Sequence, residues 1–156
     1  MTRLHEQIET ALPPEAAFAY VADFANAAEW DPGTARSERV DPGPVGVGAR
    51  YRLDVRIGSR IAPMEYRITA FEPSRRVVLE GTGSGVSAVD EIRFAPAGQG
   101  TRIDYAADIR LGGLLRFIQP LLGGAFKRVA LDAATGMRRT LDARAGAATS
   151  GSAAPR

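Results

Sequence analysis

One acidic residue in this sequence is placed where it could carry out acid–base chemistry. Asp90 shares the two-residue alternation of Ala88, Ile92 and Phe94, so in a regular strand its carboxylate faces the protein interior with them. A buried carboxylate without a partner is costly, and its pKa rises until it holds a proton. Such a group can enolise or dehydrate a bound ligand. A β-bulge that turns Asp90 outward, or water at a cavity mouth, would remove this role.

Three tyrosines are the second set of candidate functional side chains. Tyr51, Tyr66 and Tyr105 fall on the apolar face of three different expected strands. Each phenol brings a hydrogen-bond donor and acceptor into an apolar interior and could orient the oxygen atoms of a ligand. They could equally be core residues whose hydroxyls reach water or a loop carbonyl. For catalysis, we pair Asp90 with Tyr105 as acid and base.

Other kinds of catalytic site find little support in the sequence. Cysteine is absent, which excludes disulfides, thiolate catalysis and zinc–thiolate sites. The one histidine, His5, lies on the polar face of the first expected strand, and any Ser-His-Asp arrangement would depend on it. Residues 81–85 have the glycine spacing of a phosphate-binding loop, but no helix follows them, so we interpret them as a turn. We predict no metal and no cofactor.

The composition is that of a single globular domain. The chain has 156 residues, 45% of them hydrophobic and 24% charged, with a formal net charge of +2. Arginines alternate with acidic residues along the chain, which argues against a nucleic-acid interface. The most apolar window, residues 111–126, is interrupted by Arg116, Gln119 and Pro120, so no integral membrane segment is predicted. We expect a cytoplasmic monomer or homodimer.

Residues 111–145 contain the element on which the predicted fold depends. Apolar residues recur there every three or four positions and form one stripe of a long amphipathic helix. Pro120 and the pair Gly123-Gly124 interrupt this pattern, so we expect a kink or a separate short turn before Leu121. The predicted stripe comprises Leu114, Ile118, Leu122, Phe126, Val129, Ala133, Met137 and Leu141.

The rest of the chain reads as strands with two short helices near the start. Alternating apolar residues between turn residues predict strands over 3–12, 34–41, 49–57, 61–72, 76–82, 86–95 and 101–111. Residues 14–24 and 27–30 are predicted to be helical. The expected fold is α+β: a curved seven-stranded antiparallel sheet around the long helix, with the two short helices after the first strand. The ordered domain covers residues 1–145, and the Gly/Ser/Ala-rich tail 146–156 is expected to be disordered.

A hollow is expected between the sheet and the long helix. A twisted sheet of seven strands curls, and one helix cannot fill its concave face. Trp30 could gate the opening of this hollow, or it could only pack the second short helix. The residues that we expect to bind a ligand there are Trp30, Tyr51, Leu53, Val55, Met64, Tyr66, Ile68, Leu79, Ile92, Tyr105, Ile118, Leu122, Phe126 and Val129.

Several short motifs accompany this order of elements. They are Pro14–Phe18, Asp23–Pro32, Val45–Gly48, Phe71–Arg76, Phe94–Pro96 and Gly100–Arg102. Over about residues 3–145 the chain resembles the START-related superfamily with the Bet v 1-like (SRPBCC) helix-grip fold, and within it the polyketide cyclase/dehydrase and lipid-transport family. The resemblance implies an apolar cavity gripped between sheet and helix. It carries over no catalytic residues, because the members share no invariant set.

Three functions remain open on this basis. The first is binding of an apolar small molecule, such as a lipid, polyketide, quinone or isoprenoid, with affinity from buried apolar area. The second is a polyketide cyclase or dehydratase that uses Asp90 and a pocket tyrosine. The third is a protein-interaction module whose cavity is vestigial. An inward Asp90 within hydrogen-bond reach of a tyrosine would favour the second, and a collapsed cavity with an exposed apolar patch the third.

Overall fold

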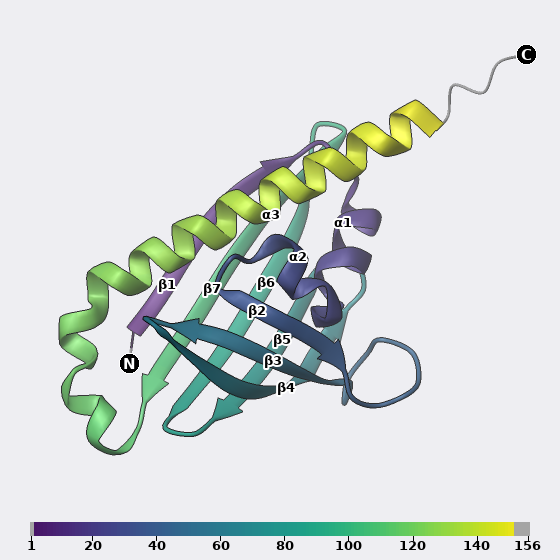
Figure 1. Cartoon of the computed structure of the whole chain (residues 1–156). Coiled ribbons are helices and arrows are strands. Elements are labelled where there is room, and N and C mark those ends of the chain that lie inside the picture. The colour runs from purple at the N-terminus through teal and green to yellow at the C-terminus, as the bar shows by residue number, and fades with distance from the viewer. Residues whose placement is uncertain (1, 152–156) are drawn as a thin grey trace, which may run out of the picture.

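The computed structural model describes the backbone of residues 2–151 and the side chains of residues 2–148. It is an α+β fold in which one curled antiparallel sheet grips a long helix, as predicted (Figure 1). The seven strands follow the order β1-β7-β6-β5-β4-β3-β2, so the first strand lies beside the last. The strands are β1 Thr2–Thr10, β2 Thr34–Arg39, β3 Arg50–Ile57, β4 Arg60–Glu72, β5 Arg76–Gly83, β6 Val86–Ala97 and β7 Gly100–Leu111. The helices are α1 Pro14–Val21, α2 Ala27–Trp30 and α3 Gly123–Gly151, with 3-10 helices η1 Phe24–Asn26, η2 Gly113–Phe117 and η3 Gln119–Leu122.

The strand alternation read from the sequence sets which side chains enter the core. In β6, Val86, Ala88, Ile92 and Phe94 are buried while Val89 is 40% exposed. Most strands are joined by tight hairpins, and Gly58 takes the positive φ that the two-residue turn between β3 and β4 requires. The resulting sheet has one face toward the helices and one face toward solvent.

The C-terminal half of α3 holds the helix against the rest of the protein. Met137 and Leu141 are fully buried on the face that the sequence predicted. Gly136 lies so close to the carbonyl oxygen of Trp30 that any larger residue would collide with the α2 backbone. Asp142 accepts hydrogen bonds from the Thr10 hydroxyl and the Ala11 amide, at 2.7 and 3.1 Å, which ties α3 to the end of β1.

The first part of the predicted long helix is not α-helical. The chain forms η2 and η3 before α3 begins at Gly123, so the interruption expected near Pro120 is present. Leu114 and Ile118 were placed on the buried stripe, and this was wrong: they are 85% and 42% exposed. Val129, farther along the same stripe, is also exposed, at 43%. Pro120 lies in 3-10 turns that precede the regular helix, so the spacing of the apolar residues before Gly123 does not report one helical face.

The other end of α3 also differs from the sequence expectation. The helical pattern was predicted to residue 145, and α3 continues to Gly151. The domain boundary at residue 145 and the disorder of the tail stay predictions. Alanine is frequent in residues 143–148 and favours the helix, which explains the longer element. Residues 152–156 of the predicted tail lie outside the described residues. No helix among residues 2–151 is long and apolar enough to cross a membrane.

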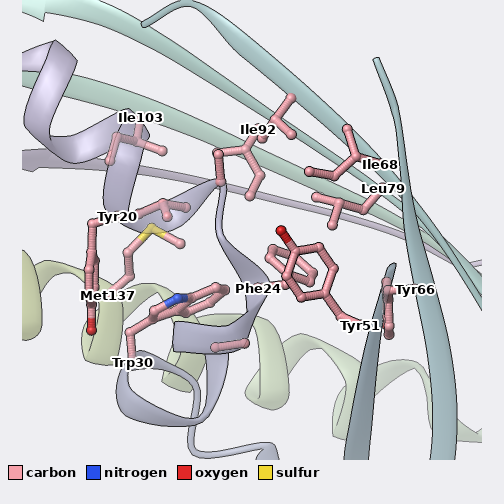
Figure 2. Close-up of a cluster of buried hydrophobic side chains, with 14 of the residues drawn as sticks. Tyr20, Phe24, Trp30, Tyr51, Tyr66, Ile68, Leu79, Ile92, Ile103 and Met137 are labelled. Carbon is pink, nitrogen blue, oxygen red and sulfur yellow. The ribbon is translucent and has the colours of Figure 1, made fainter. Parts of the chain in front are cut away.

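The core lies between the concave face of the sheet, the short helices and the C-terminal half of α3. Phe18 of α1 makes edge contacts with Phe71 and Phe94, with ring centroids 5.1 and 5.2 Å apart. Figure 2 shows Phe24 and Trp30 facing side chains from the middle strands. The short helices therefore fill one part of the concave face, and the remaining part stays open beneath the first turns of α3.

Candidate functional site

A cavity of about 130 Å³ lies between the sheet and α3. Most of its wall is apolar and comes from β1, β3, β6, β7, α2 and α3, so both the grip of the helix and the curl of the sheet create it. Its residues are Leu4, His5, Glu6, Ile8, Phe24, Ala27, Trp30, Asp31, Thr34, Leu53, Val55, Tyr66, Ala88, Asp90, Tyr105, Ala107, Ile109, Val129, Ala130, Ala133, Ala134 and Met137.

Asp90 faces this cavity and is 5% exposed. The hydroxyl of Tyr105 donates a hydrogen bond of 2.9 Å to its Oδ1 atom. Burial raises the pKa of Asp90 to about 7; the Tyr105 hydrogen bond opposes the rise, and Asp31 and Asp108 add to it. Both protonation states of this carboxyl group are therefore populated near neutral pH. A group of this kind can donate a proton to a ligand oxygen and also accept one.

Tyr105 stays protonated while Asp90 titrates. Burial, followed by the neighbouring Asp90 carboxylate, holds the pKa of Tyr105 well above its usual value. Its ring also makes an edge contact with Trp30, at a centroid distance of 6.1 Å. The phenol is therefore a fixed hydrogen-bond donor beside a carboxyl group that can be charged or neutral.

Tyr66 reaches the cavity because its strand neighbour is a glycine. Tyr66 of β4 pairs with Gly81 of β5, and a Cβ atom on Gly81 would lie 2.5 Å from the Tyr66 ring. The ring thus lies across the glycine backbone and extends toward the cavity. Burial, with a smaller effect of Asp90, raises the pKa of Tyr66 well above its usual value, so it remains a neutral phenol. Gly81 was predicted to lie near the end of a strand and in a turn, with no role at the site.

Asp31 and Thr34 also line the cavity, and the sequence analysis did not assign them a role there. The Asp31 carboxylate accepts hydrogen bonds of 2.8 Å from the Gly33 amide and from the Thr34 hydroxyl. Burial raises the pKa of Asp31, and these hydrogen bonds oppose the rise. Asp31-Pro32-Gly33 forms a turn, and α3 covers it at Gly136, which brings its acid to the cavity wall.

Trp30 is 2% exposed and packs tightly. Its ring contacts Phe24 and Tyr105, and α3 lies on its carbonyl oxygen. Its indole N–H has no hydrogen-bond partner among the described residues. Trp30 therefore forms a wall of the cavity, as expected from the sequence, and its close packing favours a structural role over the proposed gate.

The structure brings only part of the predicted lining to the cavity. Trp30, Leu53, Val55, Tyr66, Tyr105 and Val129 are in its wall, together with the predicted acid Asp90. The remaining predicted residues do not line it. They are Tyr51, Met64, Ile68, Leu79, Ile92, Ile118, Leu122 and Phe126.

The reason for these misplacements is that the short helices occupy part of the concave face. Tyr51, Ile68, Leu79 and Ile92 face inward as predicted, but they are completely buried in the core (Figure 2). Phe24 lies against Tyr51 with a centroid distance of 6.4 Å, which closes that side. Met64 is buried beside them, Leu122 and Phe126 pack against the core from the start of the helix, and Ile118 is exposed.

Comparisons with known proteins agree with this architecture. The family described as "Polyketide cyclase / dehydrase and lipid transport" matches residues 1–143. No curated protein matches the chain. The solved structure of the ZhuI aromatase/cyclase from Streptomyces sp. R1128 is similar with a TM-score of 0.72 at 16% identity, over 92% of this chain and 94% of that one. A START superfamily protein from Mycobacterium smegmatis is similar with a TM-score of 0.70 at 16% identity, over 92% and 97% of the two chains.

The structural similarities at this identity establish the fold, which is the Bet v 1-like helix grip. The family match extends over nearly the whole described chain. Family and fold together support a function in binding hydrophobic ligands or in chemistry of the polyketide-cyclase type. The protein is a member of the polyketide cyclase/dehydrase and lipid-transport family.

Proposed function

We propose that the protein binds an apolar small molecule, such as a lipid, polyketide, quinone or isoprenoid, and holds one oxygen atom of it against Asp90 and Tyr105. The observation that carries this proposal is the distribution of polarity in the cavity wall. Apolar side chains form most of it; among its titratable groups Asp90 and Tyr66 are buried, Tyr105, Asp31 and Glu6 are half-buried, and His5 is exposed. Walls of this kind supply affinity through buried area, and the few polar groups select the ligand.

The size of the cavity limits how much of a ligand it encloses. An apolar cavity of about 150 Å³ is sufficient for benzene, and this cavity has about 130 Å³. It therefore encloses about one ring or a short branched chain. Val129 lines the cavity and is 43% exposed, so a larger ligand would extend past Val129 toward solvent.

A second candidate function is acid–base catalysis on a ligand with two or more carbonyl groups. The pKa of Asp90, about 7, favours it. As a carboxylate, Asp90 would remove a proton from the carbon beside a carbonyl, and the resulting enolate carbon would bond to a second carbonyl carbon. Protonated Asp90 would then return the proton to the new alkoxide, which leaves a hydroxyl group. Tyr105 would donate a hydrogen bond to the developing oxyanion.

The binding proposal can be tested with a matched pair of small ligands. Acetophenone and ethylbenzene share a ring and a two-carbon side chain, but only acetophenone has an oxygen. We expect acetophenone to bind about tenfold more tightly, since each ligand buries the same ring and only acetophenone can accept a hydrogen bond, from the protonated Asp90 carboxyl group or from the Tyr105 hydroxyl. NMR shift changes in the cavity residues would measure both affinities.

Two variants complete this test. Asp90→Leu, which removes the carboxyl donor, and Tyr105→Phe should reduce the preference for acetophenone, whereas Glu80→Gln, at an exposed acid on β5, should leave it unchanged. Equal binding of the two ligands to the unmodified protein would contradict the proposed role of Asp90 and Tyr105. Turnover of a poly-carbonyl compound that Asp90→Asn abolishes would favour the catalytic candidate.

A collapsed cavity together with a large exposed apolar patch would favour the interaction-module alternative; the open cavity speaks for ligand binding instead. A cytoplasmic location and a monomeric or homodimeric state remain predictions. Sedimentation velocity on the purified protein would measure the second of these directly.

A further inference from the structure

The segment that joins β7 to α3 has the reverse of the usual burial pattern. Within η2 and η3 the buried residue is the polar Gln119, which is 7% exposed. Leu114, Phe117 and Leu121 are 85%, 66% and 82% exposed. We call these three side chains the exposed apolar cluster. Large apolar side chains gathered on one short segment mark an interaction surface more often than a chance exposure.

The outward orientation of the cluster is fixed by the structure around it. The Gln119 amide donates hydrogen bonds to the Thr2 hydroxyl at 2.9 Å and to the Ile109 carbonyl at 2.8 Å, and its oxygen accepts from the Leu111 amide at 3.1 Å. Gln119 therefore fastens the segment to β1 and β7. Backbone hydrogen bonds between residues three apart, such as the one that the Ile118 amide donates to the Leu115 carbonyl, satisfy polar groups of the turns themselves.

The charges beside the cluster identify the kind of partner. Arg116, Lys127 and Arg128 are exposed, and the chain contains no acidic residue between Asp108 and Asp132. None of the ion pairs among the described residues involves these three cations. Arg116 also lies over the Phe117 ring, 4.8 Å from its centroid. A surface that combines exposed leucine and phenylalanine with cations free of acidic partners among residues 2–148 matches an anionic lipid surface, where the apolar groups enter the interface and the cations meet the phosphates.

We propose that the exposed apolar cluster docks the protein on the surface of an anionic lipid bilayer. A second copy of the chain is a poorer occupant, because a two-fold interface would bring the same cations against each other. The cluster also stands on projecting turns before α3, at the end of the sheet where β1 begins (Figure 1), and a fluid bilayer needs no matching groove. Val129, in the first turns of α3, is both exposed and part of the cavity wall, so docking would bring the cavity close to the lipid.

Vesicle flotation tests this proposal with the full-length protein. We expect binding to phosphatidylcholine vesicles that contain phosphatidylglycerol, weak binding to phosphatidylcholine alone, and loss of binding at high salt. Replacing Leu114, Phe117 and Leu121 with serine should weaken binding by roughly a hundredfold. Val47→Ser is the matched control, because Val47 is 70% exposed in the loop between β2 and β3.

Charge variants of α3 provide an independent test of vesicle binding. Lys127→Glu with Arg128→Glu should weaken binding by about tenfold or more, whereas Arg138→Glu with Arg139→Glu, an exposed pair farther along the helix, should change it little. Failure of the unmodified protein to float with anionic vesicles would overturn the proposal. A second result would also overturn it: a dimer in sedimentation velocity that dissociates when Leu114, Phe117 and Leu121 are replaced with serine, while vesicle binding is absent or is not changed by the same variant.

Bilayer docking goes beyond the proposed cavity ligand, and the two can fail separately. The vesicles carry no acetophenone, and Asp90→Asn should leave vesicle binding unchanged, since Asp90 is buried in the cavity wall.

Discussion

The hydroxyl of Tyr105 donates a 2.9 Å hydrogen bond to Asp90, and the two residues belong to neighbouring strands without being direct partners. Tyr105 pairs with Ile92, and Asp90 pairs with Ala107. The two side chains are thus diagonal neighbours on the buried face, a separation that a long aromatic side chain can span. This diagonal contact gives the buried carboxyl group a donor while leaving it on the cavity wall.

Asp90→Asn should change how the stability of the protein depends on pH. The pKa of Asp90 is 3.8 when unfolded and about 7 when folded, so between these values the folded state binds the extra proton. The free energy of unfolding therefore falls as pH rises through this window and reaches its full loss, about 4 kcal/mol, above it. The variant lacks this loss, so it should be the more stable protein at pH 8.

Urea unfolding of both proteins from about pH 4 to about pH 8 measures this difference. Asp31 acts in the same direction in both proteins, because burial also raises its pKa, so the difference between the curves reports Asp90 together with its interaction with Asp31. Parallel curves would contradict a buried, titrating Asp90.

Tyr105→Phe should raise the pKa of Asp90 further. The hydrogen bond from Tyr105 favours the charged carboxylate, and its removal leaves the effect of burial unopposed. A hydrogen bond to a charged group contributes about 1.5–3 kcal/mol, which corresponds to roughly one to two pH units. NMR titration of the Asp90 carboxyl carbon would detect the shift, and a pKa that is unchanged or lower would show that the bond does not support the carboxylate.

Gly81→Ala should displace the Tyr66 ring and destabilise the protein by about 1–3 kcal/mol through overpacking. The added methyl group would lie 2.5 Å from that ring. Gly46→Ala is a suitable control, since nothing lies within 4 Å of the equivalent position. In a Tyr66→Leu background the cost of Gly81→Ala should become small, and a cost that persists there would mean that the strand itself requires glycine.

Gly136→Ala should loosen the contact between α3 and α2. The new methyl group would collide with the carbonyl oxygen of Trp30, a backbone atom that cannot turn aside. We expect a loss of about 2–4 kcal/mol in the free energy of unfolding. Gly124→Ala in the same helix meets open space, and its higher helix propensity should stabilise the protein by up to about 1 kcal/mol. Equal effects of the two substitutions would contradict the close packing at Gly136.

The sequence was most informative where a regular period had a single explanation. Strand alternation predicted the seven strands and the inward direction of Asp90, and helical spacing predicted the burial of Met137 and Leu141. The same spacing failed at Leu114 and Ile118, because the chain around Pro120 forms 3-10 turns and α3 begins only at Gly123.

The extent of the cavity could not be read from alternation. Ile68 and Leu79 face inward just as Leu53 does, and only the placement of η1 and α2 on the sheet determines which of them meets the cavity. The role of Gly81 likewise depends on the register between β4 and β5. Asp31 reaches the site through the packing of α3 on a turn, a long-range contact with no signal in the local sequence.

Native mass spectrometry of the protein as purified, followed by denaturing extraction, tests the central claim most directly. We expect a reproducible bound mass in the range of a lipid, polyketide, quinone or isoprenoid, reduced in a variant that fills the cavity, such as Ala107→Phe. A protein that carries no such mass, and whose melting temperature does not change with a panel of apolar ligands, would contradict the proposed function.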